Sequence, residues 1–110
     1  MFSLFTAKHA IAFGKTLADD LSRLYPVALD GKSKVSADRM GRILEKIYLR
    51  AQIHRDENKL GFYRKARLCH AFKWRLNEIG YNKAFVDLAT EGLVVYLHKR
   101  PSGGGPTPSR

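Results

Sequence analysis

Apolar side chains recur every three or four positions along most of the chain, which is the spacing of a helix that buries one face. The first stripe lies in residues 2–25 and comprises Ala10, Phe13, Gly14, Leu17, Leu21 and Leu24. The second lies in residues 36–55 and comprises Met40, Ile43, Leu44, Ile47, Tyr48 and Ala51. The third lies in residues 60–79 and comprises Phe62, Ala66, Cys69, Phe72, Leu76 and Ile79. Residues 82–98 are apolar on nearly all sides, as in a helix that lies centrally or packs on more than one neighbour. The pattern therefore predicts an all-α fold, a small bundle of four helices.

Local signals set the ends of these helices. Pro26 cannot donate a backbone hydrogen bond and should end the first helix, whereas Ser36 is a suitable N-cap for the second. Gly80 stands where a left-handed residue closes the third helix. Residues 93–97, LVVYL, are also compatible with a strand, because β-branched and aromatic residues favour one. No second strand candidate exists to pair with this run, so we predict a helix.

The chain is short enough to form a single domain, which we expect to cover residues 1–100. The Pro/Gly-rich residues 101–110, PSGGGPTPSR, are predicted to form a disordered tail. No targeting segment is recognisable, and no apolar run reaches the roughly 18 residues that cross a bilayer. The single cysteine, Cys69, suits a reducing compartment and is predicted to be buried and inert. We therefore expect a cytoplasmic protein.

The distribution of charge indicates what kind of partner to expect. Lys and Arg number 20 against 10 Asp and Glu, and the formal net charge is +10 at pH 7. Residues 39–75 hold eleven basic and three acidic residues, so +8 of this total lies on the second and third helices. A balance this basic favours acidic partners, such as nucleic acid, an acidic protein or an anionic membrane.

One cationic row follows the second helix, because its members are spaced by three, four and four residues. Together with three arginines of the third helix, this row forms the candidate polyanion-binding surface: Arg39, Arg42, Lys46, Arg50, Arg64, Arg67 and Arg75. The arginines of the third helix are expected on the side opposite to its apolar stripe. The alternative interpretation is a solvated face that binds nothing in particular.

A further stripe of the third helix carries Tyr63, His70 and Trp74, here called the aromatic flank. In one interpretation the flank is a second packing face that covers the last helix. We favour this one, because aromatic residues at helical spacing usually belong to the core or its rim. In the other, the flank is a half-exposed platform on which bases stack beside arginines that hold phosphate.

The segment LNEIGYNKAFVDLA, residues 76–89, resembles the helix-turn-helix of DNA-binding proteins, with apolar residues and Gly80 at the positions of that motif. The resemblance implies a recognition helix that starts near Asn82 and presents to the major groove Asn82, Lys83, Ala84 and Asp87. Leu76 departs from the motif, which has a small residue there, and Asp87 and Glu91 would face phosphate. We therefore favour a plain helical hairpin turn.

The spacing of residues along the sequence predicts no catalytic or metal-binding site. Four histidines stand far apart without metal-ligand spacing: His9, His54, His70 and His98. Cys69 and His70 are neighbours, so on a helix they point about 100° apart and cannot form a nucleophile–base pair. We predict no catalytic residue, metal, cofactor or small-molecule substrate.

The sequence thus predicts a small, basic, non-enzymatic binding module whose favoured partner is RNA or DNA. The alternative is a protein-interaction or oligomerisation module that uses the aromatic flank and the last helix, with an acidic protein or a second copy of the chain as partner. Membrane association through Phe2, Leu4 and Phe5 is disfavoured, because that helix mixes basic and acidic residues.

Overall fold

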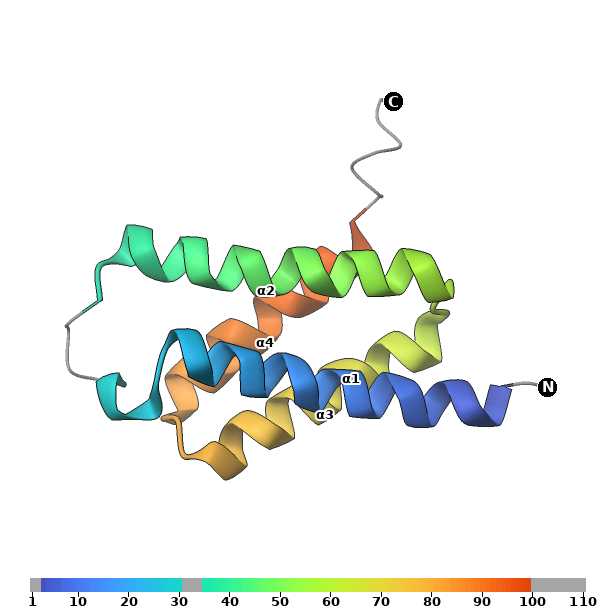
Figure 1. Ribbon diagram of the computed structural model, residues 1–110, viewed down its shortest axis with the longest axis horizontal. Helices are drawn as coiled ribbons and strands as arrows, with labels where there is room; N and C mark the ends of the chain where they lie inside the picture. Colours follow the sequence, from blue (N-terminus) through green and yellow to red (C-terminus); the bar gives the residue numbers. More distant parts are fainter. Residues whose placement is uncertain (1–2, 31–34, 100–110) are drawn as a thin grey trace.

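The computed structural model describes residues 3–30 and 35–99, which form four α-helices and one short 3-10 helix (Figure 1). In chain order these are α1 (Ser3–Leu24), η1 (Val27–Leu29), α2 (Ala37–Asn58), α3 (Phe62–Ile79) and α4 (Lys83–His98). The all-α four-helix prediction is confirmed, and the LVVYL run is helical within α4. The predicted tail, residues 101–110, lies outside the described residues.

The observed caps confirm two of the predicted helix ends, the start of α2 at Ser36 and the end of α3 at Gly80. The Ser36 hydroxyl accepts a hydrogen bond from the Arg39 backbone N–H at 3.1 Å, which satisfies one free donor of the first turn of α2. Gly80 closes α3 with φ 113°, a left-handed conformation that a residue without a side chain adopts readily. α2 runs three residues further than the predicted Arg55, to Asn58, and ends at the left-handed Lys59.

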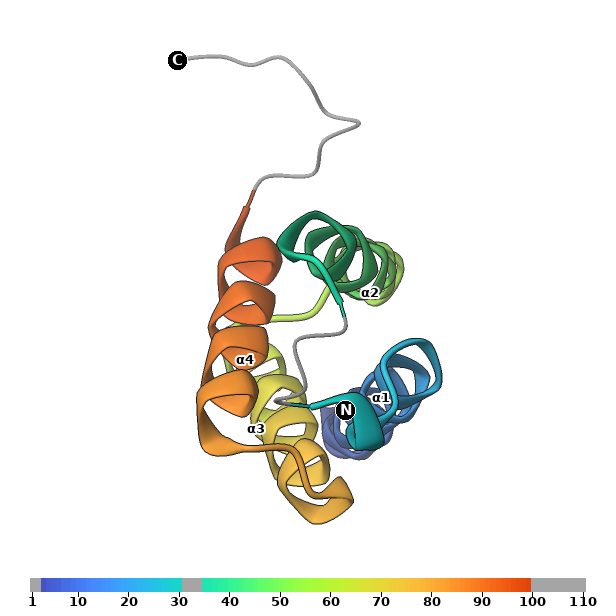
Figure 2. The ribbon, with the colours of Figure 1, turned by 90° about the vertical axis from the view of Figure 1, so that its left-hand side faces the viewer.

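Each helix runs opposite to the one before it, so α1 is roughly parallel to α3, and α2 to α4 (Figure 1). α1 packs mainly on α3, whereas α4 packs on both α2 and α3. The contact between α1 and α2 is the smallest of these. Viewed end-on, α4 and α3 lie on one side of the bundle and α2 and α1 on the other (Figure 2).

The core lies between the helices and contains large side chains from all four of them. Those with no or almost no exposed surface are Leu17, Leu21, Ile47, Leu68, Phe72, Leu76, Val86, Leu93 and Leu97. Two glycines permit close helix approach. A Cβ on Gly14 would lie 2.4 Å from the Leu68 carbonyl oxygen, so α1 and α3 touch backbone to backbone there. A Cβ on Gly92 would meet the Tyr48 ring.

The predicted inner face of α3 needs correction. Phe62 is 77% exposed and Ala66 is exposed, whereas Leu68 and Ala71, which the predicted stripe omitted, are buried. The reason is that two neighbours cover α3 from different directions: α1 lies against Leu68 and Ala71, and α4 packs on the helix as well. The covered arc is therefore wider than one stripe and rotated away from Phe62.

Two other apolar faces are less buried than the pattern suggests. Leu24, the last residue of the predicted stripe of α1, is 40% exposed. α4 does pack on two neighbours, as predicted, but it is not enclosed by the bundle, because Leu88 and Val95 are each more than half exposed. An apolar strip of α4 therefore faces solvent.

Candidate nucleic-acid interface

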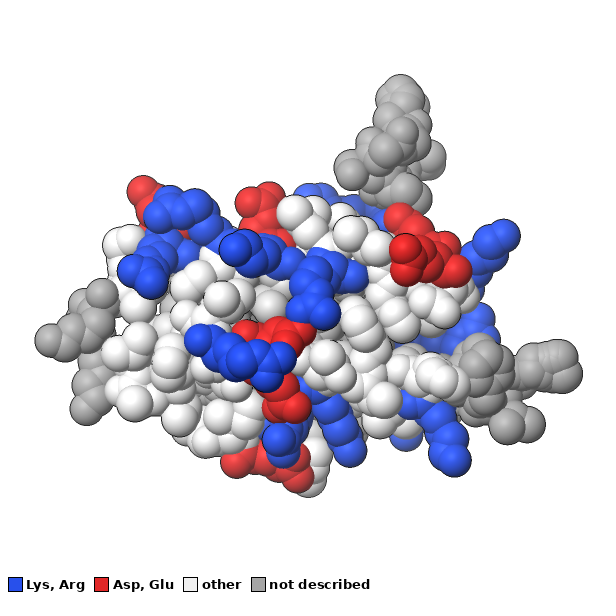
Figure 3. Space-filling model, in the orientation of Figure 1, with Lys and Arg blue, Asp and Glu red and all other residues white. Residues whose placement is uncertain are grey.

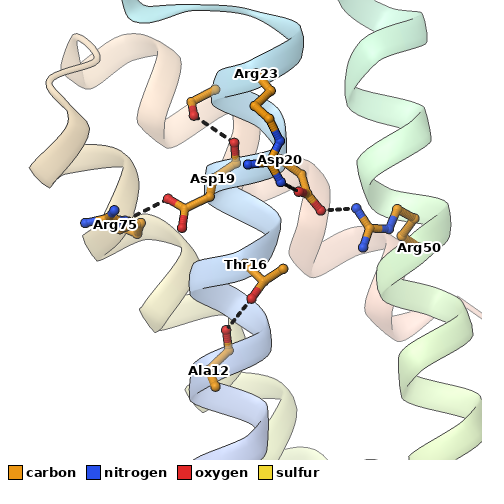
Figure 4. A network of polar contacts seen from close by, with 8 residues as sticks. Ala12, Thr16, Asp19, Asp20, Arg23, Arg50 and Arg75 are labelled. Atoms are coloured by element: carbon orange, nitrogen blue, oxygen red, sulfur yellow. Dashed lines mark hydrogen bonds and ion pairs between the residues drawn. The ribbon is translucent and has the colours of Figure 1, made fainter.

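The predicted cationic row lies on the exposed side of α2, and basic side chains gather over the first half of this helix (Figure 3). The structure divides the row. Arg50 at its end pairs with Asp20 of α1, which also pairs with Arg23 (Figure 4). Arg39, Arg42 and Lys46, here called the basic triad, form no ion pair with any acidic residue in the described ranges 3–30 and 35–99.

The basic triad borders a shallow groove of about 420 Å³ between the end of α1 and the first half of α2. Leu24 and Ile43 are its apolar lining. The triad spans eight residues of helix, so its first and last members are seven rises of 1.5 Å, or about 10 Å, apart along the axis. Phosphates along one strand of a duplex recur about every 3.4 Å of axis, so this length matches about three phosphates.

The three arginines of α3 do not form the common surface that was predicted. Arg75 donates to Asp19 of α1 at 2.8 Å (Figure 4). It also donates to Glu78 at 3.3 Å, and the two hydrogen bonds raise the pKa of its guanidinium. Arg64 is half-buried and donates to the Lys59 carbonyl oxygen at 3.2 Å. Arg67 is exposed and makes no ion pair with the described acidic residues. The predicted surface is therefore split by carboxylates of α1, which sequence spacing along α3 could not reveal.

The prediction that the aromatic flank packs under α4 is wrong. Tyr63 is 65% exposed, Trp74 is 57% exposed, and His70 is exposed as well. α1 and α4 both cover other sides of α3, so no helix is left to cover the flank. The His70 and Trp74 rings lie nearly parallel, 17° apart, with their centroids 6.5 Å from each other.

Trp74 and His70 border a second concavity, between α1 and α3, of about 230 Å³. Its other lining residues are Ile11, Lys15, Arg67 and Ala71. Sequence reasoning missed Lys15 and Ile11 as neighbours of the aromatic flank. No local pattern indicates them, because only the parallel packing of α1 on α3 brings these residues together.

The start of α4 does not present free side chains to a DNA groove. The Asn82 side chain caps α4 by accepting from the Phe85 N–H at 3.0 Å, and its amide donates to Asp30 at 2.7 Å. Lys83 donates to Asp87 at 2.8 Å, which lowers the pKa of that carboxyl. The polar groups of the would-be recognition helix are thus bonded to one another and to Asp30. This arrangement agrees with the helical hairpin rather than with a recognition helix.

The described residues hold no cluster of three or more His, Cys, Asp or Glu that could bind a metal ion. Cys69 is buried, and burial raises the pKa of its thiol to about 11. The thiol is therefore protonated near neutral pH and a poor nucleophile. Within residues 3–30 and 35–99, no helix has both the length and the apolar character to cross a membrane.

Comparisons with known protein families, with curated proteins and with solved structures find no match to this chain.

Proposed function

We propose that this chain is a non-enzymatic module that binds RNA or DNA, with the basic triad Arg39, Arg42 and Lys46 contacting phosphates. The observation that supports it is the contrast between this triad and the cations around it. Arg50 and Arg75 are paired with carboxylates of α1, whereas the triad lacks acidic partners within the described residues.

Repulsion between the three positive charges of the triad favours the binding of an anionic ligand. Like charges three and four residues apart on a helix repel one another, by roughly 0.2–0.5 kcal/mol per pair. A phosphate chain relieves that repulsion and releases its own condensed counterions, which is the main source of sequence-independent affinity for nucleic acid. Two of the three residues are arginines, whose planar guanidinium can bind phosphate through two hydrogen bonds.

The test measures affinity across a salt series. Fluorescence anisotropy of labelled 20-nucleotide RNA and DNA, single-stranded and duplex, is followed between 25 and 200 mM NaCl. The triad variant Arg39→Gln/Arg42→Gln/Lys46→Gln should bind more weakly at every salt concentration. Its slope of log affinity against log salt should flatten by about two to three units, because each lost phosphate contact removes about 0.7–0.9 units.

A charge-matched control separates local contacts from total charge. The control variant removes an equal number of positive charges, three, from the α2–α3 turn and from α3: Lys59→Gln/Lys65→Gln/Lys73→Gln. We expect a smaller loss of affinity and a smaller change of slope. Equal effects of the two triple variants would show that the triad is an ordinary part of a basic surface, and no binding by the parent chain at 25 mM NaCl would refute the proposal.

A second candidate function is association with another protein or a second copy of the chain. The observation that favours it is an apolar groove of about 350 Å³ between α2 and α4, bordered by the exposed Leu88 and Val95 and by Tyr96. Sedimentation at equilibrium distinguishes the two: a mass of twice 12.5 kDa without affinity for nucleic acid would favour this candidate.

Together with this function we propose a cytoplasmic location. Nucleic acid is accessible there, and a chain with a single cysteine, which cannot form an intrachain disulfide, suits that compartment.

A further inference from the structure

The concavity between α1 and α3 differs from the groove of the basic triad in having an aromatic wall. Trp74 and His70 form that wall from one side of α3, one helical turn apart. Because their rings are parallel within 17°, a flat ring that lies parallel to the indole is also nearly parallel to the imidazole. Ala71 and Ile11 provide small and apolar surface next to them.

Two cations border the same concavity, Lys15 from α1 and Arg67 from α3. Both are exposed, and neither forms an ion pair with an acidic residue that the structure describes. An aromatic surface flanked by unpaired cations has the chemistry of sites that hold a base and its adjoining phosphate.

The size of the concavity limits what it can hold. At about 230 Å³ it is smaller than the roughly 300–1,000 Å³ of pockets that enclose a whole small molecule. It has room for one flat ring, with the rest of the ligand lying on the surface outside. This suits one base of a longer chain better than a free metabolite.

We propose that this concavity receives an unpaired base of a single-stranded nucleic acid, which stacks on Trp74 while Lys15 and Arg67 bind the neighbouring phosphate. The inference rests on the proposed function and deepens it, because it assigns a single strand rather than a duplex as the ligand of this concavity. The bases of a duplex are stacked on each other and their faces are inaccessible to an indole, whereas a single strand can turn a base outward.

The experiment uses the indole itself as the probe, because Trp74 is the only tryptophan of the chain. Unlabelled dT12, rU12 and a 12-base-pair duplex are titrated at 50 mM NaCl while tryptophan fluorescence is recorded. Affinity is measured in parallel by the anisotropy of labelled strands. We expect both single strands to quench the fluorescence at saturation, and the duplex to bind without quenching it.

Variants assign the effect to the concavity. Trp74→Leu should lower the affinity for single strands by about 5- to 150-fold, the range for loss of one base–aromatic stack, and leave duplex affinity unchanged within twofold. Because Trp74 is 57% exposed, the variant should keep the parent's circular dichroism and melting midpoint. Lys15→Gln/Arg67→Gln should weaken single-strand binding more than the control Lys65→Gln/Lys73→Gln, which removes the same charge elsewhere on α3.

The outcomes separate this inference from the proposed function. The triad variant should bind both ligands more weakly yet still be quenched when saturated with a single strand. Suppose that single strands bind in a salt-dependent way, that tryptophan fluorescence does not change, and that Trp74→Leu binds them with the parent's affinity. This result would overturn the inference and leave the proposed function standing. Quenching by free dTMP at the concentrations that suffice for dT12 would also overturn it, in favour of a free nucleotide. Absence of any binding by the parent chain would remove both.

Discussion

Arg55 shows how a single charged side chain can hold two helices together inside this small bundle. It is 5% exposed, and its guanidinium donates to the backbone carbonyl oxygens of Tyr96, Leu97 and Lys99 at 2.7–3.1 Å. The last carbonyls of a helix have no partner within it, and a cation there also interacts favourably with the helix dipole. Arg55 of α2 therefore caps α4.

Replacing this side chain should destabilise the fold without touching the proposed sites. Arg55→Met keeps much of the length but leaves the Leu97 and Lys99 carbonyl oxygens without this donor, whereas the Tyr96 oxygen still accepts from the Gln52 amide and the Lys99 N–H. We therefore expect the free energy of unfolding to fall by about 2–4 kcal/mol. Urea denaturation measures it. Arg55→Lys, which keeps the charge but offers a smaller set of donors, should lose less. Equal stability of the Met variant and the parent would contradict the capping role.

His54 contributes a dependence of stability on pH. Its ring stacks on Phe13 with centroids 3.8 Å apart, and burial lowers the pKa of the imidazole. Glu57 opposes this shift by raising the pKa, whereas His9 lowers it further. Because the folded pKa lies below the unfolded value of about 6.5, the unfolded chain binds more protons as the pH falls. The contribution of His54 is therefore complete above pH 6.5 and declines as the pH falls from there toward the folded pKa.

We expect the free energy of unfolding to decrease from pH 7.5 to pH 5.5. In His54→Phe, a ring that stays neutral and can still stack on Phe13, this decrease should be smaller. Chemical denaturation of both proteins at the two pH values gives the comparison. An identical decrease in both would assign the pH dependence to other groups.

At the scale of the helices, the approach of α1 to α3 depends on Gly14. Its missing side chain lets the Leu68 carbonyl oxygen come within 2.4 Å of where a Cβ would stand. Backbone atoms of a packed helix cannot move aside as a flexible side chain can. This contact fixes how α1 lies on α3, and so it also sets the place of Lys15 beside Trp74.

Gly14→Ala should therefore separate the two helices and reduce stability by about 1–3 kcal/mol, despite the gain in helix propensity. Gly41 of α2 is the matched control, because a Cβ there would meet no atom within 4 Å. Gly41→Ala should stabilise the fold by about 0.5–1 kcal/mol. Thermal and urea unfolding of the two variants would show opposite signs, and a stabilising Gly14→Ala would contradict the close approach.

For the molecule as a whole, the formal net charge of +10 acts against folding. α1 and α2 are 22 residues long, about 33 Å each, which is comparable to the Debye length of about 30 Å at 0.01 M salt. At that salt concentration, charges at opposite ends of the bundle still repel one another. At 0.15 M the screening length is about 8 Å, and distant repulsion is largely lost.

Raising NaCl from 10 to 200 mM should therefore raise the melting midpoint. Screening of the repulsion between like charges within the basic triad alone should raise it by something on the order of 2–8 °C. The triad variant Arg39→Gln/Arg42→Gln/Lys46→Gln should start from a higher midpoint at low salt and rise less. Calorimetry without ligand measures both. A midpoint that falls with salt would mean that ion pairs such as Arg75–Asp19 outweigh the repulsion.

The sequence by itself determined the features that depend on near neighbours in the chain. Helices form where apolar residues recur with helical period. Ser36 marks the start of one helix, and Pro26 and Gly80 mark the ends of two others, because each acts on the backbone within a few residues. The concentration of positive charge on α2 and α3 is likewise a property of the chain alone. Even the burial of Arg55 has a local signal, because this residue continues the inner stripe of α2 seven positions after Tyr48.

The tertiary structure decided which sides of these helices are covered and which charges remain free. Helical period states which residues share a side but not how many neighbours cover the helix or at what angle. α3 is covered by α1 over Leu68 and Ala71, so its buried arc turned away from Phe62 and left Trp74 exposed. The same packing placed Asp19 beside Arg75 and Asp20 beside Arg50, pairs that lie 56 and 30 residues apart in the chain. Carboxylates of α1 therefore pair with Arg50 and Arg75, whereas the basic triad and the two cations beside Trp74 have no acidic partner among the described residues.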